Sequence, residues 1–493
     1  MKATFLFQNP FMTGTDLFEQ YETYPSTWDE MCHEHKIRSH YSKVFEDMND
    51  IPADVLQQRD LLASELFMNQ GITFTVYNDE AGIERIFPFD IIPRILTSTE
   101  WDHIEKGIKQ RLRALNLFLK DIYSTQQIVK DGIIPSELIV TCPHYTREIF
   151  RIKVPYDLYV HISGIDLIRG DDGTFYILED NLRTPSGVSY MLANREVTKR
   201  IFPEMLTHSS VRMISNYPLL LHNILSELAP QQISNPTVVL LTPGVFNSAY
   251  FEHTFLARQM GIDLVEGRDL LVDNHKVYMK TTAGLQQVHV IYRRIDDEYL
   301  DPLVFKPDSA LGVPGLMSAY RKGNVAIVNA VGNGVADDKA VYAYVPAMIK
   351  YYLNEEIILP NVPTYSLENE DEKKYVFDNI EKMVLKRTNQ SGGYGMVMGN
   401  RATEKELKEV KKAVKKTARE FIAQPIIKLS TVPCFIDGKL QPRHVDLRPY
   451  ALCGPNGIHI VPGGLTRVAL REGSLVVNSS QGGGSKDTWV VDL

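Results

Sequence analysis

The sequence predicts a multidomain protein of mixed α/β and α+β class. Its 493 residues are enough for about three domains of ordinary size. Between residues 201 and 335, apolar strands alternate with helices, which is typical of an α/β unit. The C-terminal part of the chain is rich in apolar strands separated by glycine turns, as in an α+β unit.

Charge and cysteine content restrict the expected partners and compartment. Lys and Arg total 53 against 61 Asp and Glu, giving a net charge of −8, so we expect no nucleic-acid or membrane partner. No apolar run is long enough to cross a membrane, and the amino terminus lacks the apolar core of a signal peptide. The cysteines are far apart, which argues against zinc and against a disulfide framework: Cys32, Cys142, Cys434 and Cys453. We expect a cytoplasmic protein with free thiols.

A long amphipathic helix is predicted over residues 99–123. Its apolar residues recur at spacings of three and four, as one face of a helix requires: Ile104, Ile108, Leu112, Leu115, Leu119 and Ile122. Thr99 is the expected N-cap. The apolar stripe must pack against another part of the protein.

A hairpin is predicted over residues 160–181, with Gly170-Asp171-Asp172-Gly173 at its turn. A turn of two or four residues centred between Asp171 and Asp172 would place Asp166 opposite Ile177. Three oxygen-bearing side chains would then share one face, whereas a turn of three or five residues would break the arrangement: Asp166, Glu179 and Asn181. Such side chains suit a hard cation, but they are also common turn formers and helix caps.

Residues 201–335 are predicted to form a small doubly wound α/β domain. "PTVVLLTPG" indicates a buried strand, "SAYFEHTFLARQMGI" a helix and "DLVEG" a second strand, and "VHVIYRRIDDEYLDP" adds another strand with a charged end. The turn after the first strand lacks G-x-G-x-x-G, so we do not expect a dinucleotide there.

A lysine followed by a glycine loop indicates a phosphate site further along the chain. Lys386 ends an apolar strand in "VLKRTNQSGGYGMVMG", and Gly392, Gly393 and Gly395 lie before the next strand. Glycine backbone N–H groups can close over phosphate oxygens, and a lysine adds a positive charge. The alternative is a glycine-rich hairpin that binds no ligand.

Two common nucleotide-binding classes do not fit this loop. "GGGSKDT", at residues 482–488, has the wrong spacing for a P-loop. A protein kinase places its glycine loop before the lysine, and here "HVDLRPYAL" has Ala451 where the catalytic-loop asparagine should be; no D-F-G is present.

The remaining motifs resemble those of the ATP-grasp fold, in which two α+β halves hold ATP between them. Lys339 in "GVADDKAVYAYVP" resembles the first nucleotide lysine of that family, and Lys386 with "SGGYG" resembles the second lysine and its flexible loop, including Tyr394. "FIAQPIIK" is similar to the strand that reads adenine through Gln424 and the backbone near Ile427. Arg448 in "VDLRPY" and Arg467 in "GGLTRVA" resemble arginines that contact the transferred phosphoryl group. "NSSQGGGSKDTW" resembles a segment near the substrate, through Asn478 and Lys486.

The order of the motifs resembles that of a circularly permuted ATP-grasp protein. An ordinary ATP-grasp chain would continue with a helix, an Asp strand and a Glu-x-Asn strand that binds magnesium, and these match residues 98–181. The chain is therefore similar to the permuted group that includes glutathionylspermidine synthase. The resemblance implies three regions: the permuted part in 1–200, a pre-ATP-grasp-like domain in 201–335, and the nucleotide-binding subdomains in 336–493.

The resemblance implies an ATP-dependent carboxylate–amine ligase. ATP and Mg²⁺ would be its cofactors, with metal ligands Asp166, Glu179 and Asn181. Its substrates would be a small-molecule or peptide carboxylate and an amine, as in glutathionylspermidine synthesis, and the turn bearing Arg183 and Ser186 would hold the carboxylate. The alternatives are an ATP-binding regulatory or scaffold protein and an ATP-grasp kinase that does not ligate.

Overall fold

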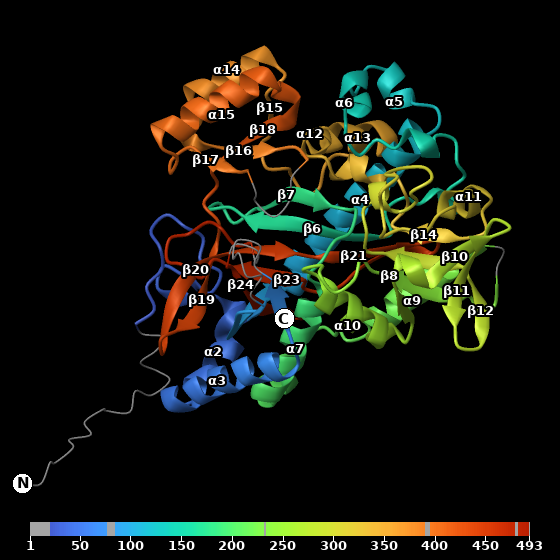
Figure 1. The fold of residues 1–493 in the computed structure, drawn as a ribbon. Helices are drawn as coiled ribbons and strands as arrows, with labels where there is room; N and C mark the ends of the chain where they lie inside the picture. Colours follow the sequence, from blue (N-terminus) through green and yellow to red (C-terminus); the bar gives the residue numbers. More distant parts are fainter. Residues whose placement is uncertain (1–19, 76–83, 231–232, 390–394, 479–481, 493) are drawn as a thin grey trace, which may run out of the picture.

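A computed structural model describes residues 20–492 apart from 76–83, 231–232, 390–394 and 479–481 (Figure 1). Its largest element is a mixed sheet that contains nine of the described strands. The main path runs β22-β21-β6-β20-β23-β24-β5, with β7 paired to β6 and β19 paired to β20. The strands are β5 (Phe89–Thr97), β6 (Ile162–Arg169), β7 (Phe175–Asn181), β19 (Thr431–Ile436), β20 (Lys439–Arg448), β21 (Tyr450–Gly454), β22 (Gly457–Ile460), β23 (Leu465–Val468) and β24 (Gly484–Val491).

This sheet joins strands from the two ends of the sequence. β24 pairs in parallel with β5, and Val491 lies opposite Thr97, the residue before the long helix α4 (Ser98–Ile122). β20 and β21 pair with β6. The C-terminal strand therefore ends beside the start of α4, although the two are at opposite ends of the chain.

The long helix predicted over residues 99–123 is confirmed as α4, one residue earlier at each end. All six residues of the predicted apolar stripe are buried. The predicted cap at Thr99 is wrong, because Thr97 accepts a hydrogen bond from the Glu100 N–H while Glu100 accepts one from Thr97, forming a capping box. α4 packs against α13 (Val345–Leu353) and against the large sheet.

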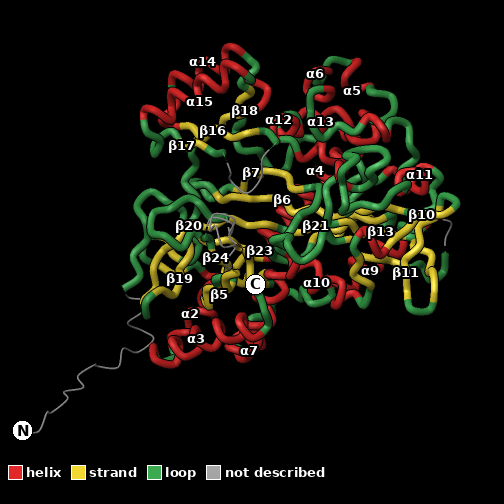
Figure 2. The backbone as a smooth tube through the Cα atoms, viewed as in Figure 1, coloured by secondary structure: helices red, strands yellow, loops and turns green. Residues whose placement is uncertain are grey.

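Helices cover both faces of the large sheet, as Figure 2 shows. α4 belongs to a core on one face, while α3 and α7 contribute to a separate core on the other. The bounds of α3, α7 and further helices are as follows: α2 (Ser42–Asn49), α3 (Ala53–Asn69), α5 (Gln127–Lys130), α6 (Ser136–Val140), α7 (Val188–Ile201), α8 (Pro203–His208) and α12 (Lys339–Tyr342). Short strand pairs are β1 (Cys32–His33) with β2 (Lys36–Ile37), and β3 (Thr73–Thr75) with β4 (Glu84–Ile86).

The hairpin of β6 and β7 differs in register from the prediction. Its turn has three residues, because Gly170 bonds to Thr174, and Leu167 lies opposite Ile177. The predicted opposition of Asp166 and Ile177 is therefore wrong. A bulge at Leu178 then shifts the register, so that Asp166 lies directly opposite Glu179. The odd turn and the bulge compensate for each other, and Asp166 and Glu179 are brought together.

Residues 238–328 contain a small, fully parallel sheet in the order β14-β13-β8-β9. Its strands are β8 (Val238–Leu241), β9 (Asp263–Val265), β13 (Val290–Arg293) and β14 (Ala326–Val328). Alternate residues of β8 enter different cores, so both faces are buried, as in a doubly wound sheet. Nearby elements are α9 (Tyr217–Glu227), α10 (Tyr250–Met260) and α11 (Leu316–Arg321), and a separate meander of β10 (Leu270–Asp273), β11 (Lys276–Thr281) and β12 (Gly284–Val288).

A small lobe with its own apolar core lies above the large sheet in Figure 1. Its sheet has the order β15-β18-β16-β17, and helices α14 (Glu370–Asp378) and α15 (Glu404–Lys416) pack on it. The strands are β15 (Tyr365–Ser366), β16 (Met383–Arg387), β17 (Val397–Met398) and β18 (Phe421–Pro425). β16 and β17 are the strands predicted on either side of the glycine loop. None of the described helices has the length and apolar character needed to cross a membrane.

Candidate functional site

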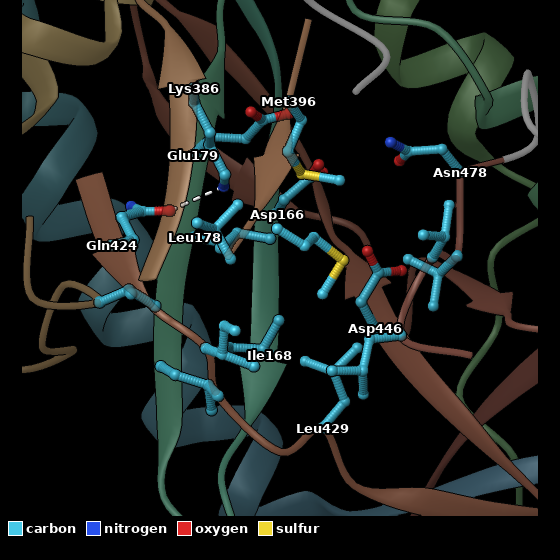
Figure 3. A pocket seen from close by; sticks show the side chains of 18 of the residues that line it. Asp166, Ile168, Leu178, Glu179, Lys386, Met396, Gln424, Leu429, Asp446 and Asn478 are labelled. Carbon is cyan, nitrogen blue, oxygen red and sulfur yellow. Dashed lines mark hydrogen bonds between the residues drawn. The ribbon is translucent and has the colours of Figure 1, made fainter. Parts of the chain in front are cut away.

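A cavity lies between the small lobe and the large sheet, and encloses about 990 Å³ of empty space that is partly open to solvent. Figure 3 shows Lys386 and Gln424 on one side of it, Asp446 on another, and Ile168 and Leu429 on its floor. Apolar side chains form much of the wall, including Leu178, Val362, Val384, Met398 and Ile427. Charged side chains also line it: Asp166, Glu179, Lys339, Lys386, Arg387, Asp446 and Arg467. An apolar chamber with a charged region can hold a flat ring and an anionic tail.

Lys386, on β16, points into the cavity and is held by Gln424, on β18. Its ammonium donates a hydrogen bond of 2.7 Å to the Gln424 side-chain oxygen, and the Gln424 nitrogen donates one of 2.9 Å to Thr364. Burial lowers the pKa of Lys386 to about 8, although Glu179 acts in the opposite direction. Both ends of the Gln424 amide thus bond to groups of the protein, and its oxygen holds the Lys386 ammonium in place.

Glu179 links the lysine pair to the hairpin. Lys339, at the first position of α12, places its ammonium 3.4 Å from a Glu179 carboxylate oxygen. The Lys339 backbone N–H donates to the carbonyl of Thr388, which follows β16. The ammonium groups of Lys339 and Lys386 therefore share one cavity with the Glu179 carboxylate.

Asp166 accepts hydrogen bonds from both arginines predicted to act in catalysis. Arg448 donates to its two oxygens at 2.5 and 2.8 Å, and Arg467 donates to one of them at 2.7 Å. Burial alone would raise the pKa of Asp166, but these two guanidinium groups outweigh it and hold that pKa well below its usual range. Asp166 is therefore a buried carboxylate that stays ionised.

Asn181 faces a second, smaller hollow of about 260 Å³ that is also lined by Arg183, Asp337 and Lys339. Its side-chain nitrogen is buried and has no hydrogen-bond partner within the part of the chain that the structure describes. Lys339 lines both spaces, so it lies between Asn181 and the cavity that Glu179 faces.

The donor set of the hairpin fits a hard cation. Asp166 and Glu179 offer carboxylate oxygens from directly opposed positions, and the unsatisfied Asn181 amide lies two residues further along β7. Among the described residues, no group of three His, Cys, Asp or Glu side chains could hold a metal by itself. A cation at this hairpin would therefore need the Asn181 amide, or phosphate oxygens of a ligand, to complete its shell.

The turn after β7 is fixed to this cluster. Arg183 donates to Asp337 at 2.8 Å and lies 3.5 Å from Asp296. The carbonyl oxygen of Ser186 accepts hydrogen bonds from Arg448 at 3.2 Å and from the Tyr450 hydroxyl at 3.1 Å. The backbone of Ser186, rather than its hydroxyl, thus connects the turn to the arginine.

The remaining predicted residues have mixed outcomes. Ile427 and Asn478 line the cavity. Lys486, for which substrate binding was predicted, does not line the cavity. It is fully buried on a central strand of the sheet and is bonded to Asp90 and to the carbonyl of Pro433. Gly395 adopts a positive φ of 67° before β17, whereas Gly392, Gly393 and Tyr394 lie outside the described residues.

Asp446 is a cavity residue that the sequence reasoning missed. It lies directly opposite Arg467 in the β20–β23 pairing and accepts hydrogen bonds from it. The available signal was its alternation with Arg448 in "VDLRPY", which places both on one face of β20.

A comparison with protein families assigns this architecture. The family described as circularly permuted ATP-grasp type 2 matches residues 93–469. The chain belongs to this family. The fold described above is therefore that of a circularly permuted ATP-grasp protein.

Several bacterial proteins resemble this ATP-grasp chain over most of its length. A Synechocystis sp. (strain ATCC 27184 / PCC 6803 / Kazusa) protein, named as uncharacterized, is 53% identical over 444 residues, covering 90% of this chain and 92% of that protein. One from Mycobacterium tuberculosis (strain ATCC 25618 / H37Rv), also named as uncharacterized, is 49% identical over 482 residues, covering 97% and 87%.

A longer relative carries a more specific name. The Frankia alni protein "Putative glutamate--cysteine ligase 2-3" is 40% identical over 476 residues, covering 96% of this chain but only 54% of that protein. Among solved structures, a glutathione synthetase-like effector from Globodera pallida in its apo form has a TM-score of 0.59 and 12% identity, covering 89% of this chain and 98% of that one. The structural likeness supports the ATP-grasp fold.

Proposed function

We propose that this protein is an ATP-dependent ligase that joins a carboxylate to an amine through an acyl phosphate. The observation that carries the proposal is the arrangement of one cavity. Its apolar part suits adenine, and Lys339, Lys386, Glu179, Asp166 and Arg467 gather where a triphosphate would extend. Two lysines and two arginines around two carboxylates suit phosphoryl transfer, in which positioning and charge neutralisation supply most of the catalysis.

Each group would have a defined role. Lys339 and Lys386 would neutralise phosphate oxygens of ATP, while Gln424 keeps Lys386 in place. Arg448 and Arg467 would stabilise the charge that develops on the transferring phosphoryl group. Asp166, Glu179 and Asn181 would hold Mg²⁺, which when bound supplies charge neutralisation at the β- and γ-phosphates. The turn bearing Arg183 and Ser186 would orient the substrate carboxylate.

The reaction would proceed in two balanced steps. An oxygen of the substrate carboxylate attacks the γ-phosphorus, the bond to the β-phosphate oxygen breaks, and ADP leaves. The neutral amine then attacks the acyl carbon, loses a proton and forms an amide, while inorganic phosphate leaves with the carboxylate oxygen. In each step the two reacting groups are bound at fixed positions, so the reaction between them is effectively intramolecular.

The relatives support a ligase more than they support particular substrates. The Frankia alni protein is named for glutamate–cysteine ligation, which is also the formation of an amide from a carboxylate and an amine. This chain spans about half of that protein, so glutamate and cysteine are not carried over to it. A small-molecule or peptide carboxylate, including one similar to the substrates of glutathionylspermidine synthase, is the proposed class. The proposed compartment is the cytoplasm, where ATP is present and the four free thiols stay reduced.

The test is to incubate the purified protein and Mg-ATP with pooled peptides, organic acids and amines, following ADP release and the mass of products together. The proposal expects ADP and a condensed product in equal amounts. ATP binding without ADP would instead indicate a regulatory or scaffold protein. ADP with a phosphorylated product and no condensed product would indicate a kinase.

A further inference from the structure

Asp446 faces the cavity, but neither the sequence motifs nor the proposed function gives it a role (Figure 3). It is buried on β20 opposite Arg467, on β23. The Arg467 Nε donates to its two oxygens at 2.9 and 3.1 Å, and a terminal nitrogen of the same guanidinium also donates to it. That same terminal nitrogen donates to Asp166 at 2.7 Å. Arg467 therefore lies between two buried carboxylates.

Asp446 is itself held from behind. Its backbone carbonyl accepts a hydrogen bond of 2.9 Å from Arg94. Arg94 makes a bidentate ion pair with Glu30, at 2.8 and 2.5 Å, and all three residues are buried. Glu30 lies before the segment matched by the family, which begins at residue 93. The N-terminal region is thus connected to the cavity through a chain of buried polar contacts.

Asp166 has more partners in the proposed reaction than Asp446 has. It bonds Arg448 and Arg467 and is also a proposed metal ligand, so a cation would compete with both arginines for its oxygens. Asp446 bonds Arg467 alone through its side chain, among the described contacts. Asp446 can therefore hold the Arg467 guanidinium in place when Asp166 also binds a cation.

We propose that Asp446 is a positioning residue that keeps Arg467 directed at the transferring phosphoryl group when Asp166 binds metal. The inference rests on the proposed function, because it gives Arg467 a phosphoryl group to contact. Under this inference, Asp446 contributes to stabilising the transition state of phosphoryl transfer and contributes little to binding ATP in the ground state. Other residues supply the lysines and the apolar wall that bind ATP.

The experiment uses a mimic of the transferring phosphoryl group, so that it needs no knowledge of the acceptor. Binding of Mg-ADP is measured by calorimetry with and without aluminium fluoride, for the wild type and for Asp446→Asn, Arg467→Lys and the double variant. The matched control is Asp487→Asn, another buried aspartate, which bonds Arg195 at 2.7 Å and does not line the cavity.

The wild type should bind ADP more tightly when aluminium fluoride is present. In Asp446→Asn, the increase in ADP affinity caused by aluminium fluoride should be at least about tenfold smaller than in the wild type. The affinity of this variant for Mg-ADP alone should stay within about twofold of the wild-type value. The control variant should keep the full increase. In the Arg467→Lys background, Asp446→Asn should add almost nothing, because it acts through that guanidinium. Glu30→Gln should show a smaller loss in the same direction, which provides a second variant if Asp446→Asn does not fold.

Three results would overturn the inference. Asp446→Asn could weaken Mg-ADP and raise the Mg²⁺ requirement to the same extent, as for a metal ligand. Its loss could add in full to that of Arg467→Lys, or the wild type could gain nothing from aluminium fluoride. A wild type that gains affinity with the mimic but condenses no product from the pooled substrates would contradict the ligase proposal alone.

Discussion

Asp166 and Glu179 lie directly opposite each other on the β6–β7 hairpin, because a bulge at Leu178 compensates for a turn of three residues. Without the bulge, the odd turn would place Leu178 opposite Asp166 and send Glu179 to the other face. The bulged residue is also used, since Leu178 lines the apolar part of the cavity. One irregularity therefore contributes both to the proposed metal site and to the proposed adenine chamber.

Replacing Glu179 by Gln should abolish magnesium-dependent ATP turnover with little effect on folding. The only ion pair described for Glu179 is the 3.4 Å contact with Lys339, so few stabilising contacts are lost. Loss of a metal carboxylate should reduce turnover by roughly a hundredfold or more. The measurement is ADP release against Mg²⁺ concentration, with unfolding followed by calorimetry.

Glu204→Gln is the matched control for this change. It also removes a carboxylate that bonds one basic residue, Arg59, at 2.8 Å, but it lies on α8 and does not line the cavity. Its turnover should match the wild type. Intact magnesium-dependent turnover in Glu179→Gln would show that the metal assignment is wrong.

ATP affinity should fall as pH rises through about 8, because the pKa of Lys386 is lowered to about that value, chiefly by burial. Below this pH the ammonium is protonated and attracts phosphate, whereas above it the neutral amine loses that attraction. Bound phosphate favours the charged form, so binding at pH 8.5 should be accompanied by proton uptake. Calorimetry in buffers of different ionisation enthalpy measures both effects.

Lys386→Arg provides the control, since a guanidinium stays protonated across this range. The ATP affinity of Lys386→Arg should stay nearly constant from pH 7 to pH 9.5. Over the same range the ATP affinity of the wild type should fall roughly tenfold. A wild-type affinity that does not change with pH would mean that Lys386 does not contact the phosphates.

Gly187→Ala should destabilise the protein by about 1–3 kcal/mol. Gly187 has a φ of 109°, and an added Cβ would lie 2.5 Å from the Tyr450 hydroxyl, the group that holds the Ser186 carbonyl. Gly71→Ala separates strain from crowding, because Gly71 also has a positive φ, 63°, but no atom lies within 4 Å of the added carbon. The midpoint of thermal unfolding should fall further for Gly187→Ala, and equal shifts would contradict the crowding argument.

The sequence was most informative where local periodicity and burial agree. The apolar stripe of α4 and the strands on either side of the glycine loop follow from side-chain spacing alone, and the structure confirms them. The family resemblance supplied what periodicity could not, namely which distant segments meet. Asp166 and Lys386 are more than two hundred positions apart, yet they line one cavity.

The errors arose where details of the backbone, such as turn length and strand pairing, determine which residues meet. A turn of three residues and a bulge leave no clear signature in "RGDDGTFYILEDN", so the pairing partner of Asp166 was wrong although its face was right. Lys486 lies beside a glycine-rich motif, but its strand is central and its ammonium is buried against Asp90. Asp446 was missed because its partner Arg467 is brought opposite it only by strand pairing.

The most direct measurement follows oxygen-18 from a substrate carboxylate once the pooled assay has identified a substrate pair. The account predicts that each amide formed is accompanied by one inorganic phosphate carrying one labelled oxygen, because the carboxylate oxygen attacks the γ-phosphorus and leaves with it. Condensed product accompanied by unlabelled phosphate would contradict the acyl-phosphate ligase.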